Sequence, residues 1–123
     1  MSSVSNNAMG PVKPADDEAR EIFHQVKEEI VDKIHEIHHA DHVHGLHETD
    51  RLKHISAFKV VQYAVEEVAY GLNYFAKIDL GDDKYIHARA HKSNQGQVDF
   101  YSLYTTPENA IWTLEEPLVY FND

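Results

Sequence analysis

The sequence predicts a single α+β domain in which one long N-terminal helix packs on an antiparallel sheet of four to five strands. From Ala19 to Ile37, apolar residues recur at three- and four-residue steps, which is the period of an amphipathic helix. After residue 56 the period changes to two, as it does in strands with one buried face. The chain of 123 residues is long enough to build one hydrophobic core.

The N-terminal part of the chain divides into a tail and the expected helix. Residues 1–14 are small, polar and punctuated by glycine and proline, so we expect a flexible trunk there and a domain over residues 15–123. Asp16 is the expected N-cap, because its carboxylate can accept a hydrogen bond from the first turn. We expect the helix to continue to about His42. Its apolar face consists of Ala19, Ile22, Phe23, Val26, Ile30, Ile34 and Ile37.

Four strands joined by tight turns are expected after the helix. Alternating apolar and polar residues cover the ranges 61–66, 74–79, 86–91 and 98–104. The turn signals between them are Tyr70-Gly71, Gly81-Asp82-Asp83 and Asn94-Gln95-Gly96-Gln97. A meander of this kind needs one face covered, and the helix supplies the cover. The sequence after Thr105 predicts no particular element.

Composition excludes several classes of function. Twenty-one acidic residues against eleven basic ones give a net charge of -10 with neutral histidines, which does not favour nucleic acid or an anionic membrane as a partner. The absence of cysteine excludes disulfides and a cysteine nucleophile, and it fits a reducing compartment. Catalytic motifs are missing, and the acid pairs Glu66-Glu67 and Glu115-Glu116 are interpreted as solvated charge. The N-terminus lacks the features of a signal peptide, and no apolar run is long enough to span a membrane. We therefore expect a cytoplasmic protein that is not an enzyme and needs no cofactor.

Three stretches of the chain resemble the stefin-type cystatins, a family of cysteine protease inhibitors. They are KPADDEAREIFHQVKEEI, VQYAVEEVAYGLNYFAKIDLGDDKYIHARAHKS and the terminal LVYF, and they cover roughly residues 10–34 and 57–104. The resemblance implies a cystatin-like fold, with a helix wrapped by the sheet. It also implies a reversible competitive inhibitor of papain-like, cathepsin-type proteases. In that family the N-terminal trunk and two hairpin loops form a wedge that enters the active-site cleft.

The resemblance assigns the wedge to particular residues of this chain. Gly71 matches the glycine that ends the first loop, whereas Glu67 and Ala69 stand where the family usually has glutamine and valine. One additional residue before Gly71 predicts a bulge or a larger loop. Gly10 is the candidate glycine of the trunk. The full set of expected protease-binding residues is Met9, Gly10, Glu67, Val68, Ala69, Tyr70, Gly71, Asn94, Gln95, Gly96 and Gln97.

A histidine-rich insertion occupies about residues 35–55, where the family has no counterpart. On a continuous helix four of these histidines would share one stripe, at a spacing that can bind zinc, nickel or copper. These candidate ligands are His35, His38, His39 and His42. The interpretation we prefer is a solvated, weakly basic surface without a native metal. The alternative function is a non-inhibitory protein of the same fold that binds metal or a partner through this insertion.

The expected oligomeric state is mainly a monomer. Hairpin loops of this kind can open and exchange strands between chains, which gives domain-swapped dimers. Such an exchange would straighten residues 67–71 and remove the wedge.

Overall fold

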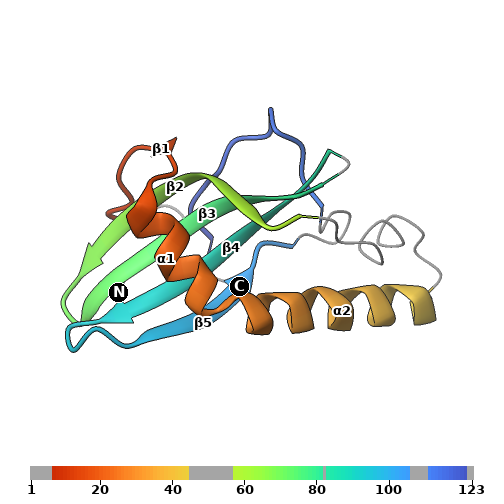
Figure 1. The fold of residues 1–123 in the computed structure, drawn as a ribbon, viewed down its shortest axis with the longest axis horizontal. Helices are drawn as coiled ribbons and strands as arrows, with labels where there is room; N and C mark the ends of the chain where they lie inside the picture. Colours follow the sequence, from red (N-terminus) through yellow and green to blue (C-terminus); the bar gives the residue numbers. More distant parts are fainter. Residues whose placement is uncertain (1–6, 45–56, 82, 106–110, 122–123) are drawn as a thin grey trace.

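The computed structural model describes residues 7–81, 83–105 and 111–121, except 45–56, and it describes no side chains for residues 37–44. The described elements follow the order β1 (Lys13–Pro14), α1 (Asp17–Gln25), α2 (Lys27–His44), β2 (Lys59–Val68), β3 (Gly71–Gly81), β4 (Lys84–Ser93) and β5 (Val98–Leu103). Two helices and a five-stranded antiparallel sheet confirm the α+β class (Figure 1). Within the described part, neither helix is long and apolar enough to cross a membrane.

The sheet is a meander in which each strand pairs with its neighbour in the sequence, in the order β1-β2-β3-β4-β5. The strand β1 lies in the segment that we expected to be a flexible trunk. It pairs with β2, with Lys13 opposite Tyr63. A register shift in β2 lies between Val60 and Gln62, while the hairpin at the end of β2 keeps a two-residue loop. From Gln62 to Val68 the pairing with β3 is regular, so this stretch contains neither a bulge nor a longer loop, and the register shift lies before it.

The helical segment is interrupted at Val26, although the sequence predicts one continuous helix. Val26 has φ -110° and ψ 13°, and α2 begins directly after it. No glycine or proline occurs near this point, so the sequence gives no signal for the break. The interruption leaves Val26, Ile30 and Ile34 buried, and α2 then extends beyond the sheet (Figure 1).

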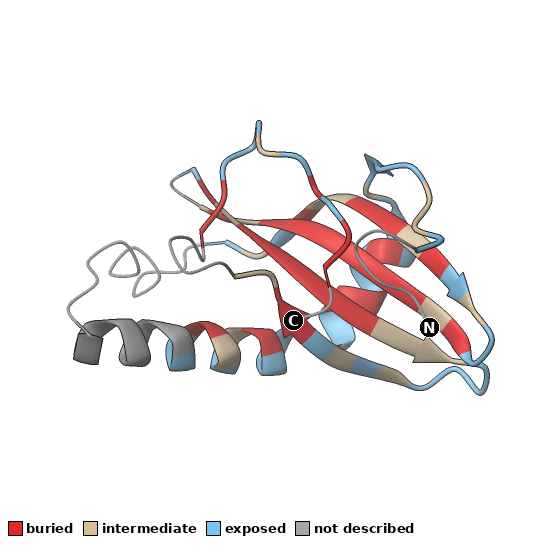
Figure 2. Cartoon of the chain, turned by 180° about the vertical axis from the view of Figure 1, so that it is seen from behind, coloured by how far each residue is buried: buried red, intermediate tan, exposed pale blue. Residues whose placement is uncertain are grey.

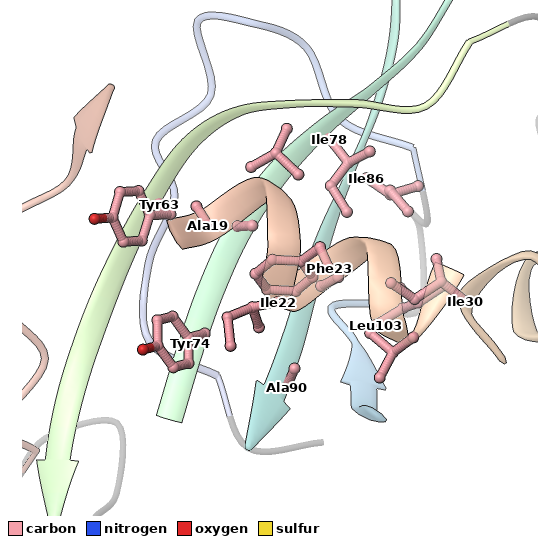
Figure 3. Packing of buried hydrophobic residues seen from close by; sticks show 14 of the residues in the cluster. Ala19, Ile22, Phe23, Ile30, Tyr63, Tyr74, Ile78, Ile86, Ala90 and Leu103 are labelled. Atoms are coloured by element: carbon pink, nitrogen blue, oxygen red, sulfur yellow. The ribbon is translucent and has the colours of Figure 1, made fainter. Parts of the chain in front are cut away.

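The main core lies between the helices and one face of the sheet, which we call the front face. Phe23 and Ile22 of α1 pack on this face, among side chains that come from all four long strands (Figure 3). The expected N-cap is confirmed, because the Asp16 carboxylate accepts a hydrogen bond from the Ala19 N–H (3.1 Å). A second bond from the Tyr63 hydroxyl (2.7 Å) contributes most to lowering the pKa of Asp16.

The opposite, back face of the sheet is covered by residues 111–121, which we call the C-terminal strap. It lies behind the sheet in Figure 1 and in front of it in Figure 2. Leu118, Tyr120 and Phe121 of the strap form a second core with Phe75 of β3. The tail that the sequence leaves without an element is therefore a layer of the fold, and both faces of the sheet are buried.

Two cations on the back face bind the strap through its backbone. The Lys77 ammonium donates hydrogen bonds to the carbonyls of Thr113 (2.7 Å), Leu114 (2.9 Å) and Glu116. Burial lowers the pKa of Lys77. Arg89 donates from Nη1 to the Phe121 carbonyl (2.8 Å). These bonds compensate for the removal of both charges from water.

His87 is the third polar residue under the strap, and it has a different environment. Its ring stacks on Trp112 (centroids 5.3 Å apart) and on Tyr104 (6.2 Å). Only 1% of the residue is exposed, and neither ring nitrogen has a hydrogen-bond partner among the described residues. Burial, and to a smaller extent the Lys77 charge, lowers the pKa of His87 to about 3. His87 is therefore neutral in the folded protein.

Candidate functional site

The structure brings the three segments of the expected wedge to one end of the sheet. Met9 forms an isolated bridge with Glu66, two residues before the end of β2. The β2–β3 and β4–β5 hairpins turn at this same end, because Gly71 pairs with Ser93. The N-terminal segment and both hairpins accordingly lie at the left end of the sheet in Figure 1. Residues remote in the sequence thus form one continuous edge.

The first hairpin has a two-residue loop whose side chains face solvent. Val68 pairs with Gly71, so Ala69 and Tyr70 alone form the turn. Tyr70 is 64% exposed, and Ala69 and Glu67 are also exposed. The Tyr70 ring lies 5.1 Å from the ring of His91, a contact that holds it over β4. The turn therefore presents one aromatic ring and little other bulk.

Gly71 differs from the rest of this hairpin because it is buried within the sheet. Its φ is 147°, a conformation that side chains rarely adopt, and a Cβ built there would lie 2.1 Å from the carbonyl oxygen of Lys92. The glycine is thus required for the close approach of β3 to β4. Its contribution to the site is to hold the two hairpins together.

The trunk lies along the edge of β2. The Gly10 N–H donates to the Val65 carbonyl (2.8 Å), and a Cβ at Gly10 would meet that same oxygen at 3.3 Å. The Met9 side chain is half-buried and packs against the second core. Residues 9–14 thus have defined contacts within the segment that the sequence describes as flexible.

The second hairpin loop consists of Asn94 to Gln97 and is exposed throughout. Gly96 takes φ 92°, and a Cβ at this position would have nothing within 4 Å. Asn94 donates from Nδ2 to the Ala69 carbonyl (3.2 Å), which connects this loop to the tip of the first hairpin. A hydrogen bond therefore joins the two loops at the surface that they share.

One buried acid beside the site contradicts the sequence interpretation. The pair Glu66-Glu67 is expected to be solvated, but Glu66 is 0% exposed and only Glu67 faces solvent. The Glu66 carboxylate accepts hydrogen bonds from Asn73 Nδ2 (2.9 Å) and from the Ala8 N–H (3.1 Å). Glu66 follows Ala64 by two residues, so both side chains lie on the back face of β2. This spacing is the sequence signal that could have indicated its burial.

The histidine-rich insertion is described only in part. The backbone of α2 includes His35, His38, His39 and His42, and His35 is exposed. The side chains of the other three lie outside the described residues, as do residues 45–56. Where side chains are described, no three histidines or carboxylates are grouped as a metal site. The candidate metal ligands thus remain a prediction from the sequence.

The comparisons with known proteins agree on one kind of relative. The chain is 32% identical to human Cystatin-A over 89 residues, which cover 72% of each protein. It is 32% identical to bovine Cystatin-A over 81 residues, 66% of this chain and 64% of that protein. Cystatin-A of the cat is 27% identical over 84 residues, 68% of this chain and 67% of that protein. The chain matches no protein-family model.

Proposed function

Since the chain belongs to the stefin-type cystatins, whose members inhibit cysteine proteases, we propose that it is a reversible competitive inhibitor of papain-like enzymes. The wedge consists of Met9–Gly10, the first loop from Glu67 to Gly71, and the second loop from Asn94 to Gln97. The observation that supports this most is the convergence of these segments on one edge, where Asn94 bonds to Ala69. Such an edge complements a narrow cleft by shape and requires no chemistry.

The same geometry explains how the first loop would resist cleavage. Its turn contains only two residues, and Val68 and Gly71 are paired directly beside it. The contact of Gly71 with β4 fixes the C-terminal side of the turn. The backbone therefore cannot extend at the tip without breaking pairs on both strands. We propose that the loop occupies the cleft while its peptide bonds stay out of reach of the nucleophile.

Substitutions at the tip provide a direct test of this function. Tyr70→Ala removes an exposed ring that would be buried in the complex, and the inhibition constant for papain should rise about tenfold. Ala69→Val adds two methyl groups and should lower that constant by up to about tenfold. Leu114→Ala is the control, because Leu114 is another exposed apolar side chain (51%) but lies on the strap.

The assay measures hydrolysis of a small fluorogenic substrate by papain with purified, folded inhibitor. Competitive inhibition, with the expected order of the variants, supports the proposal. A folded parent protein that leaves papain active at tens of micromolar refutes it. If Leu114→Ala and Tyr70→Ala changed the inhibition constant equally, the tip of the first hairpin would not be part of the binding surface.

The charge of Glu67 gives a second, independent variant. This carboxylate is exposed at the end of β2 and would lose water on entering a cleft. Glu67→Gln reduces that cost and should strengthen inhibition by about 1 kcal/mol or less, unless the protease supplies a donor. The same inhibition assay measures it. Clearly weaker inhibition by this variant would show that the target binds the carboxylate.

We further propose a cytoplasmic monomer as the inhibitory form, acting on cathepsin-type enzymes, because stefins are typically intracellular. Strand exchange at the first hairpin would abolish the paired turn between Val68 and Gly71. Size-exclusion chromatography at micromolar concentration should give mainly monomer, and cell fractionation should recover the protein in the cytosol. A dimer alone, or recovery from another compartment, would contradict the respective statement.

A further inference from the structure

We propose that the buried Glu66 is a positioning residue that holds the N-terminal trunk in register with the first hairpin. This inference rests on the proposed function for its consequence, but its structural part can be measured without a protease. Glu66 lies on the back face, two residues before the end of β2, and is 0% exposed. Its side chain is therefore shielded from water directly behind the wedge.

The Glu66 carboxylate connects the trunk to the sheet. Oε2 accepts a hydrogen bond from the Ala8 N–H (3.1 Å), and Oε1 accepts one from Asn73 Nδ2 (2.9 Å). Ala8 and Glu66 are 58 positions apart in the sequence. One acidic side chain thus bonds the trunk with one oxygen and β3 with the other.

The same network continues to the tip of the first hairpin. Asn73 is 2% exposed, and its Oδ1 lies 2.8 Å from His91 Nδ1 on β4. The His91 ring in turn contacts the ring of Tyr70. An unbroken series of contacts therefore leads from the trunk across three strands to the exposed aromatic residue of the wedge.

The energetic argument depends on the burial of a carboxylate. A buried carboxylate requires hydrogen-bond donors, and it loses one when the trunk leaves. Release of Ala8 is therefore opposed by more than the loss of an ordinary surface hydrogen bond. In the free inhibitor the docked trunk has already lost part of its conformational entropy. Binding a protease then costs less than it would with a free trunk.

Paired variants separate this role from a general loss of stability. Glu66→Ala removes the acceptor, whereas Glu66→Gln retains an oxygen for the Ala8 N–H if the Asn73 amide reverses. Ala8→Pro removes the donor from the other side, at an exposed position that should not affect folding. Ala8→Gly retains the N–H and is its matched control. Ile78→Val, a buried change on the front face, controls for stability alone.

The first measurement is amide hydrogen exchange of the full chain by NMR. In the parent the Ala8 amide should be protected, and Glu66→Ala should accelerate its exchange about tenfold or more. Glu66→Gln and Ile78→Val should retain most of the protection. For Ala8→Pro the Gly10 amide is observed instead, and its exchange should be faster than in Ala8→Gly. An unprotected Ala8 amide in the parent would overturn the inference even if Glu66→Ala failed to fold.

The second measurement is a double-mutant cycle on papain inhibition. Glu66→Ala and Ala8→Pro should each raise the inhibition constant by up to about tenfold. The inhibition constant of the double variant should be no more than about twofold above that of either single variant. Additive effects would mean that Glu66 does not act through the trunk, and they would overturn the inference. If the parent does not inhibit papain, the proposed function fails, whereas the exchange data still decide whether Glu66 positions the trunk.

Discussion

Replacing His87 by phenylalanine should remove a large part of the loss of stability that this protein suffers on mild acidification. In the folded state His87 is stacked against Trp112 and Tyr104, with Lys77 as the neighbouring charge. Burial lowers its pKa from 6.5 to about 3. Phenylalanine has nearly the same shape and can keep the stacking, but it cannot bind a proton.

The direction of the effect follows from proton binding by the two states. Between about pH 6.5 and pH 3 the unfolded chain protonates His87 and the folded chain does not. The free energy of unfolding is therefore highest above this window and decreases as the pH falls through it. Relative to pH 7.5, protonation of His87 at about pH 5 raises the population of the unfolded state about thirtyfold. The free energy of unfolding decreases by roughly 2 kcal/mol.

The assay is equilibrium unfolding by urea at about pH 7.5 and pH 5, followed by circular dichroism and by the fluorescence of Trp112, the single tryptophan. The difference between the two pH values should be smaller in His87→Phe by about 2 kcal/mol. His24→Gln, at an exposed histidine of α1, is the matched control and should keep the parental difference. The same difference in the parent and in His87→Phe would refute the argument from burial.

Three further tests of the fold use substitutions at glycines, at Lys77 and at Asp16. In urea titrations, Gly71→Ala should lower the free energy of unfolding by more than about 2 kcal/mol, because its Cβ would overlap the Lys92 carbonyl. Gly96→Ala has free space around its Cβ and should lower that free energy by only about 1 kcal/mol. Lys77→Met leaves three strap carbonyls without their donor and should accelerate cleavage of the strap by a glutamate-specific protease; an unchanged cleavage rate would contradict this. Asp16→Ala should lower the melting temperature at neutral pH, whereas Asp16→Asn retains the N-cap acceptor and should lower it less.

The front face of the sheet could be predicted from the sequence because apolar residues recur at every second position of the strands. Ile78 stands between Lys77 and Asp79 in the sequence, and it lies with Phe23 of α1 in the main core. The back face could not be predicted, because its Lys77 and Arg89 have the composition of a solvated surface. Both are buried, since strap carbonyls replace water around their charges. Alternation indicates a solvent face only where nothing covers that face.

The candidate site was predictable to a similar extent. The two loops and Gly71 come from the resemblance to stefins, and the structure explains Gly71 by its contact with β4. The burial of Glu66 was missed, because its partners Ala8 and Asn73 come from two other segments of the chain. A sequence pattern describes the neighbours of a residue along one element. It does not describe donors that arrive from elsewhere.

The packing of Met9 affects the order in which the parts of this protein can fold during synthesis. Met9 rests on the second core, and three of the four buried members of that core are Leu118, Tyr120 and Phe121. During synthesis these three residues leave the ribosome after every strand of the sheet. The nascent chain can form its helices and hairpins before then, but the second core on which Met9 packs is still incomplete. The edge that the trunk shares with both hairpins is thus completed by residues translated after the whole sheet, so a ribosome-bound chain would display both hairpins before its trunk is fully docked.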